Sequence, residues 1–131
     1  MKRLCLVLLA ILLIHVAACD DENKHGYDYL AASYIDTVLA ADAVHNGELV
    51  QIVHVYPEGC NHFERIESAE HGDSLALSAI YHYYYAGRPC AHGSGLDTTA
   101  SRLFFSSSGT HFLVYRRSEG ARIVQSIFIE D

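Results

Sequence analysis

Two cysteines in this chain are each followed, two positions later, by a histidine: Cys60 and His62 in GCNHF, and Cys90 and His92 in PCAHG. Side chains two positions apart on a strand point to the same side of a sheet, so each pair could present a sulfur and a nitrogen together. Two cysteines and two histidines form a sensible ligand set for zinc or copper. The spacing is not a known zinc signature, and the alternative is a disulfide that leaves the two histidines beside it.

Histidines are frequent along the rest of the chain, which contains nine in total. His54, His82 and His111 lie in separate predicted strands. Their imidazoles, with or without His62 and His92, could therefore meet as a zinc or copper site or act as a pH sensor. No two histidines have the i, i+4 spacing of a helical metal motif. Their even distribution also fits partly exposed residues that share no role.

A run of aromatic residues, YHYYY, covers positions 81–85. On a strand, Tyr81, Tyr83 and Tyr85 share one face. Tyrosine suits binding surfaces because it joins a large apolar ring to a polar hydroxyl group. This face is a candidate contact surface for a sugar, a peptide or a protein partner. The alternative is that the tyrosines cover the core of a sandwich.

Patterns that would support catalysis are weak. The stretch GSG at Gly93–Gly95 lacks the flanking residues of a nucleophile elbow, and HGDS at His71–Ser74 is typical of a turn. The sequence contains no His-Glu-x-x-His motif and no phosphate-binding loop. We therefore predict a protein without enzymatic activity and without a bound cofactor, with zinc or copper as the alternative.

The first residues have the organisation of a secretory signal peptide, with Lys2 and Arg3 before an apolar run from Leu4 to Ala18. This run is interrupted by His15 and is shorter than the roughly 20 residues of a spanning helix. It ends in Val16-Ala17-Ala18-Cys19, which resembles the lipobox of bacterial lipoproteins. The resemblance implies removal of residues 1–18 and acylation of Cys19, with palmitate among the chains. An ordinary secreted protein cleaved near Ala18 is the alternative.

The residues after Cys19 indicate to which membrane the protein is sorted. Residues 19–26 comprise the lipidated cysteine and a polar tether. Asp20 resembles the retention signal of lipoproteins that stay in the inner membrane facing the periplasm. An acidic run after the cysteine also resembles a surface-export tag, so the outer membrane and the cell surface stay open.

The charge of the chain limits its partners. The formal net charge is −7, and loss of Lys2 and Arg3 with the signal peptide changes it to −9. A negative surface argues against nucleic acid and against direct binding to anionic lipid headgroups. We expect the membrane contact to be made by the N-terminal lipid, and the partner to be an envelope protein or a glycan.

Export also decides the state of the cysteines. Cys5 leaves with the signal peptide and Cys19 is lipidated, so that Cys60 and Cys90 remain. A pair of cysteines in an oxidising compartment usually forms a disulfide. We predict that Cys60 and Cys90 are joined.

Residues 27–131 are predicted to form one mainly β domain, a small antiparallel β-sandwich or open barrel of about six strands with one N-terminal helix and a disulfide. Apolar residues at three- and four-residue spacing indicate the helix at Tyr27–His45, although its β-branched residues leave a strand as the alternative. Residues 88–100 read as a loop. The last three strands are joined by short loops, so we expect them to pair antiparallel. The predicted strands are Glu48–Tyr56, His62–Ser68, Ser74–Gly87, Ser101–Phe105, Thr110–Arg117 and Ala121–Ile129.

In the last of these strands, Ile123, Ile127 and Ile129 share a face that carries no charge, so we expect this face to point into the core. Taken together, the sequence predicts a lipid-anchored bacterial cell-envelope protein that acts as a non-enzymatic binding or interaction module. The alternative function is a periplasmic histidine-based protein that binds zinc or copper.

Overall fold

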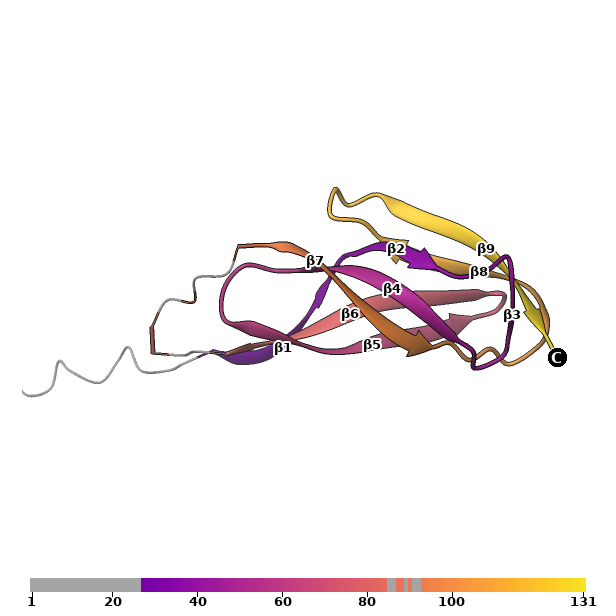
Figure 1. The fold of residues 1–131 in the computed structure, drawn as a ribbon, viewed down its shortest axis with the longest axis horizontal. Coiled ribbons are helices and arrows are strands. Elements are labelled where there is room, and N and C mark those ends of the chain that lie inside the picture. Colours follow the sequence, from indigo (N-terminus) through magenta and orange to yellow (C-terminus); the bar gives the residue numbers. More distant parts are fainter. Residues whose placement is uncertain (1–26, 85–86, 89, 91–92) are drawn as a thin grey trace, which may run out of the picture.

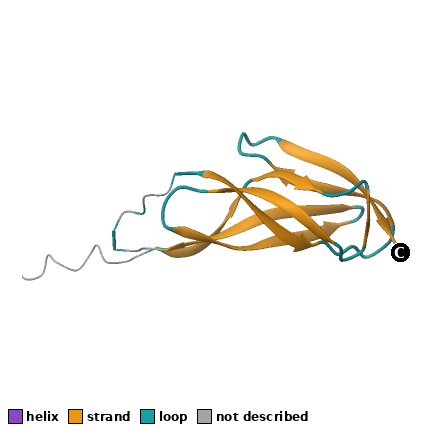
Figure 2. Ribbon diagram, in the orientation of Figure 1, coloured by secondary structure: helices purple, strands orange, loops and turns teal. Residues whose placement is uncertain are grey.

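The computed structural model describes residues 27–84, 87–88, 90 and 93–131, which form two β-sheets facing each other in an elongated sandwich (Figures 1 and 2). Within these ranges there is no helix, and thus none long and apolar enough to cross a membrane. The strands are β1 (Asp28–Ser33), β2 (Ile35–Leu39), β3 (Ala43–His45), β4 (Leu49–Tyr56), β5 (Asn61–His71), β6 (Ser74–Tyr84), β7 (Gly95–Arg102), β8 (Gly109–Arg116) and β9 (Arg122–Glu130).

The larger sheet has the strand order β1-β6-β8-β9-β3, with β5 along the other edge of β6, and the smaller sheet has the order β2-β4-β7. Most neighbouring strands are antiparallel, but β6–β8 and β3–β9 are parallel. The mainly β, two-sheet architecture confirms this part of the predicted fold class, but the described residues form nine strands rather than about six. The described strands do not close into a barrel, and their pairing is not purely antiparallel.

The helix predicted at Tyr27–His45 is wrong, because these residues form β1, β2 and β3. The chain passes from the larger sheet to the smaller one at Tyr34, between β1 and β2. A bulge then inserts one extra residue between Ile35 and Thr37, so that Ile35 and Val38 both point into the core although they are three positions apart. The bulge thus accounts for the three-residue spacing of Ile35 and Val38, and the β-branched content was the correct signal.

The loop predicted at residues 88–100 is wrong over its second half, because Gly95–Arg102 forms β7. This strand pairs antiparallel with β4 at the edge of the smaller sheet. The strand predicted at Ser101–Phe105 overlaps β7 only at Ser101 and Arg102, and the antiparallel pairing predicted between it and β8 is not formed. The predicted antiparallel pairing of β8 with β9 is confirmed. Most of β7 is exposed or half-buried, so it lacks the apolar alternation that identifies a strand.

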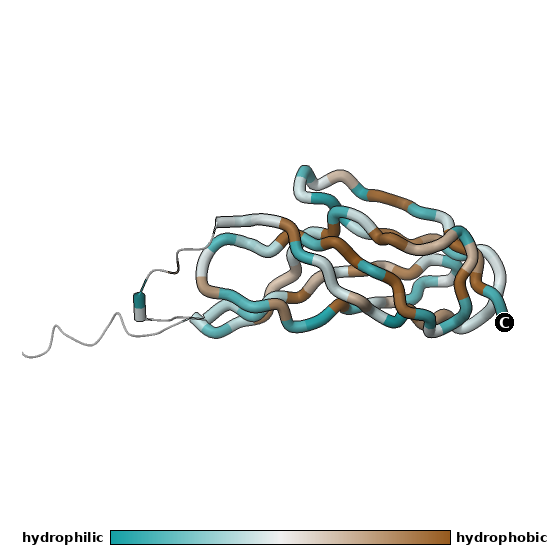
Figure 3. The backbone as a smooth tube through the Cα atoms, in the orientation of Figure 1, coloured by the Kyte–Doolittle hydropathy of each residue, from teal (hydrophilic) through white to brown (hydrophobic). Residues whose placement is uncertain are grey.

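The core lies between the two sheets and draws buried side chains from both. Hydrophobic stretches accordingly occur along strands of both layers (Figure 3). In β9, Ile127 and Ile129 are each 1% exposed, whereas Val124 is 55% and Phe128 is 47% exposed. This confirms the predicted inward face of the last strand.

Candidate functional site

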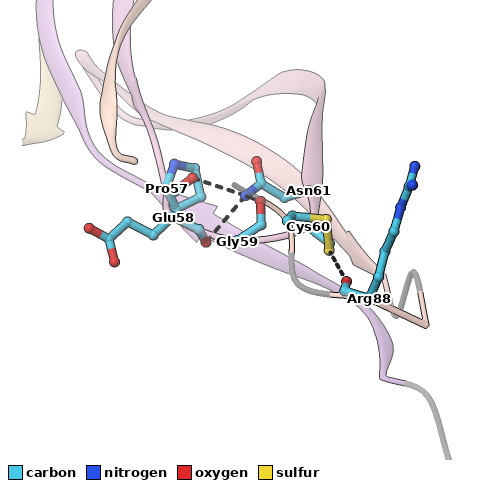
Figure 4. The surroundings of a disulfide bond; sticks show 7 residues. Pro57, Glu58, Gly59, Cys60, Asn61 and Arg88 are labelled. Atoms are coloured by element: carbon cyan, nitrogen blue, oxygen red, sulfur yellow. Dashed lines mark hydrogen bonds between the residues drawn. A yellow bond between two sulfur atoms is a disulfide. The ribbon is translucent and has the colours of Figure 1, made fainter. Parts of the chain in front are cut away.

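Cys60 and Cys90 form a disulfide with their Cα atoms 5.1 Å apart, as the sequence predicted. Cys60 is buried at the start of β5, next to the turn that follows β4. Asn61 stabilises this turn, since its Nδ2 donates to the carbonyl oxygens of Pro57 (3.0 Å) and Gly59 (3.1 Å) (Figure 4). With both sulfurs in the disulfide, neither is a thiolate ligand for a metal.

The predicted tyrosine face is not formed as expected. Tyr81 is only 2% exposed and belongs to the core. Tyr83 is half-buried, and its ring stacks on that of Tyr29 with the centroids 5.0 Å apart. Tyr85 lies outside the described residues. Tyr81 therefore cannot contact a partner, and the core-covering alternative is correct for it.

His54 and Tyr81 meet inside the sandwich. His54 is 0% exposed, and its Nδ1 lies 2.7 Å from the hydroxyl group of Tyr81. The ring of Phe63 stacks on the imidazole at a centroid distance of 4.5 Å. Burial lowers the pKa of His54, an effect that the carboxylate of Asp97 partly offsets, and burial also raises the pKa of Tyr81. The pair is therefore a neutral, structural element of the core.

The three-histidine site predicted from His54, His82 and His111 is not formed. His111 is buried at another place, where its Nε2 donates to the carbonyl oxygen of Ser107 at 2.9 Å. His82 points to the outer face of β6, opposite to its inward-facing neighbour Tyr81. Among the described residues, the group of potential metal ligands contains His82 but neither His54 nor His111.

His82 instead meets His62, and we call His62, Glu64, His82 and Asp28 the histidine cluster. The two histidines are direct partners in the β5–β6 pairing, with ring centroids 4.8 Å apart. Nε2 of His62 lies 3.4 Å from Oε2 of Glu64, and Nε2 of His82 contacts Oδ1 of Asp28. His92, the histidine that follows the second cysteine, lies outside the described residues.

A bulge in β5 brings the two histidines together. Near the β5–β6 turn, Ser68 pairs with Leu77 and Arg65 with Ile80, and this register would place His62 opposite the core-side residue Tyr83. The extra residue between Phe63 and Arg65 shifts the pairing by one position, so that His62 faces His82. The same shift directs Phe63 inward against His54.

Besides the histidine cluster, the second candidate site is a cleft with a volume of about 680 Å³, at the place where β8 separates from β6. On this edge of β6, β8 pairs only as far as Ala76 and β1 pairs only from Ala79. Leu77 and Ser78 are therefore left without a strand partner on that side and line the cleft. A volume of this size is typical of pockets for small ligands or chain segments.

The walls of the cleft combine aromatic rings with two arginines and one acidic residue, Glu58. Tyr34, Tyr83 and Tyr115 line it, together with Arg116 and Arg122. The two arginines are direct partners across the β8–β9 pairing, and both are exposed. Like charges directly opposite each other are unfavourable in a sheet unless something neutralises them. Neither guanidinium forms an ion pair with any residue that the structure describes.

Sequence reasoning missed the cleft because its residues come from distant strands. The signal that was present is the group of arginines on either side of the Glu119-Gly120 turn in a chain with few basic residues. Cys19 and Asp20, the predicted lipidation and sorting residues, lie outside the described residues. Comparison with known protein families, with curated proteins and with solved structures gives no match for this chain.

Proposed function

We propose that this protein is a lipid-anchored component of the bacterial cell envelope, and that its β-sandwich binds a carboxylate-bearing glycan in the cleft. The observation that carries the proposal is the pair of Arg116 and Arg122, neither of which has an ion-pair partner among the described residues, in a cleft of about 680 Å³ that the exposed ring of Tyr34 also lines. Arginine recognises carboxylates through two parallel hydrogen bonds. A tyrosine ring offers an apolar face for a sugar and a hydroxyl group for its polar edge.

The N-terminal signal supports the location. Lipid on Cys19, if it includes two or more chains, anchors the protein stably at a membrane. The described chain starts at the end of the sandwich where the disulfide lies, and the C-terminus lies at the opposite end (Figure 1). The cleft extends from the β4–β5 turn, where Pro57 and Glu58 line it, to the β8–β9 turn, where Ser118 lines it.

The proposal is tested with two disaccharides that differ by one carboxylate. One is the peptidoglycan unit of N-acetylglucosamine and N-acetylmuramic acid, and the other is the N-acetylglucosamine dimer, which lacks the lactyl carboxylate. Calorimetric titration of the purified protein should give saturable binding of the first disaccharide and at least about tenfold weaker binding of the second, because hydrogen bonds to charged groups contribute about 1.5–3 kcal/mol.

Variants then locate the site. Arg116→Gln and Arg122→Gln should each weaken binding of the acidic disaccharide to the level of the neutral one. Arg65→Gln is the matched control, because it removes the same charge from an exposed arginine on β5 that pairs with Glu67 outside the cleft. Equal binding of the two disaccharides, or equal loss in the Arg65 variant, would show that the cleft does not recognise carboxylates.

A further inference from the structure

We propose that the histidine cluster binds one Zn²⁺ ion through one imidazole nitrogen each of His62 and His82 and a carboxylate oxygen of Glu64, with water in the fourth position and the carboxylate of Asp28 in contact with His82. This site lies on the outer face of the β5–β6 pair and shares no residue with the cleft. The metal site therefore stands independently of the glycan proposal.

The spacing of the ligand atoms fits a tetrahedral ion. One nitrogen or oxygen atom from each of His62, Glu64 and His82 lies within 4.8 Å of the other two. The Nε2 atom of His62 and the Oε2 atom of Glu64 are 3.4 Å apart. Bonds of about 2.0–2.1 Å at tetrahedral angles separate two ligands by about 3.4 Å. One edge of the coordination polyhedron is therefore already formed, and small side-chain rotations would bring in the third ligand.

The backbone holds these side chains in position. His62 and His82 are fixed opposite each other by the pairing of two long strands, and Glu64 occupies the bulge that sets this pairing. The ring of Tyr84 lies beside both imidazoles, with its centroid 5.8 Å from that of His62 and 6.2 Å from that of His82. A bulge and a direct cross-strand pair restrict the rotamers available, so less entropy is lost when an ion binds.

Access and charge favour a cation as well. The side chains of His62 and Glu64 are about half exposed, and that of His82 is partly exposed, so that an ion can reach them from solvent. Two carboxylates and two neutral imidazoles carry a net charge of −2, which a divalent cation neutralises. Imidazole nitrogen selects Zn²⁺ over Mg²⁺ and Ca²⁺, which prefer oxygen ligands. The competing interpretation is two ion pairs without metal, one between His62 and Glu64 within β5 and one between His82 and Asp28 across β6 and β1.

The test is a titration of the full chain, purified in detergent and freed of metal with a chelator. Calorimetry should show one saturable Zn²⁺ site, and Mg²⁺ at the same concentration should give no heat of binding. His62→Ala and His82→Ala should each weaken Zn²⁺ binding by at least about tenfold, since even outer-shell partners of a metal contribute about 10- to 100-fold to affinity. Glu64→Gln should weaken it as well, because the amide carries no charge.

His45→Ala is the matched control. His45 is exposed and lies 3.6 Å from Glu130, so it forms the same kind of histidine–carboxylate pair, but it is absent from the ligand group. Its loss should leave Zn²⁺ affinity unchanged. A second readout is the melting temperature, which saturating Zn²⁺ should raise in the parent and in His45→Ala but not in His62→Ala. Absence of a saturable site, or unchanged affinity in both His62→Ala and His82→Ala, would overturn the proposal in favour of simple ion pairs.

Discussion

The hydroxyl group of Tyr81 in the larger sheet lies 2.7 Å from Nδ1 of His54 in the smaller sheet, and both residues are almost completely buried. Their contact is a polar link between the two layers. Nε2 of His54 is buried without a hydrogen-bond partner in the described structure. Protonation would place a charge on this ring inside the core, and for that reason burial lowers the pKa of His54.

This relationship predicts a loss of stability at mildly acidic pH. The folded state holds the pKa of His54 below its value in the unfolded chain, which is about 6.5. The stability that depends on a neutral His54 is therefore complete above about pH 6.5 and falls as the pH drops below that value, because only the unfolded state takes up the proton. We expect the melting temperature of the parent to fall between pH 7.5 and pH 5, and to fall less in His54→Gln.

His45→Gln is the control for this experiment, because His45 is exposed. It should retain the parent's dependence on pH. Identical pH profiles for the parent and His54→Gln would show that the pKa of His54 is the same in the folded and the unfolded state.

The second prediction concerns the two faces of β9. Ile127 is 1% exposed and belongs to the core, whereas its neighbour Ser126 is exposed. Removing the buried side chain costs about 1.5–3 kcal/mol, and placing a carboxylate there adds the cost of burying a charge. Ile127→Asp should therefore unfold the domain, while Ser126→Asp should change the free energy of unfolding by less than about 1 kcal/mol. Urea unfolding followed by circular dichroism measures both, and similar midpoints would contradict the register.

The strands that sequence reasoning found are those with clear periodicity. The predicted strands at Glu48–Tyr56, Thr110–Arg117 and Ala121–Ile129 agree with β4, β8 and β9 to within one residue at each end. These strands alternate buried and exposed side chains, or carry runs of β-branched and aromatic residues. The failures have local causes, since the bulge after Ile35 imitates a helical period and the polar edge strand β7 shows no period at all.

Among the features of the candidate sites, the sequence predicted only the disulfide, because only one pairing of cysteines was available. With Cys5 assigned to a signal peptide and Cys19 to lipidation, the sequence interpretation left Cys60 and Cys90 as the only cysteines able to pair, so that their disulfide followed from counting. The contact of His62 with His82 depends on a one-residue bulge in β5, and no sequence pattern marks that bulge. The cleft depends on the parallel pairing of β6 with β8, two strands that are separated in the chain by β7.

The third prediction concerns the disulfide. The bond closes a loop between residues 30 positions apart. For a loop of about this length, the chain-entropy estimate of the stabilisation is about 3–4 kcal/mol. The double variant Cys60→Ser, Cys90→Ser should lose a free energy of unfolding of this order in a urea titration. A reducing agent should lower the midpoint of the parent but leave that of the double variant unchanged. A parent that is insensitive to reduction would show that the bond contributes little.

The last prediction tests the anchor. Val16-Ala17-Ala18-Cys19 resembles a lipobox, and the thiol of Cys19 is the atom that would carry the lipid. In bacteria fed a labelled fatty acid, the parent should incorporate the label and sediment with membranes. Cys19→Ala should incorporate none, and it should appear either uncleaved or in the soluble fraction, because one apolar run interrupted by His15 is too short to span the bilayer stably. Cys5→Ala is the matched control, since it removes a thiol from the same segment outside the lipobox, and it should be labelled like the parent. Equal labelling of Cys19→Ala and the parent would refute lipidation at this residue.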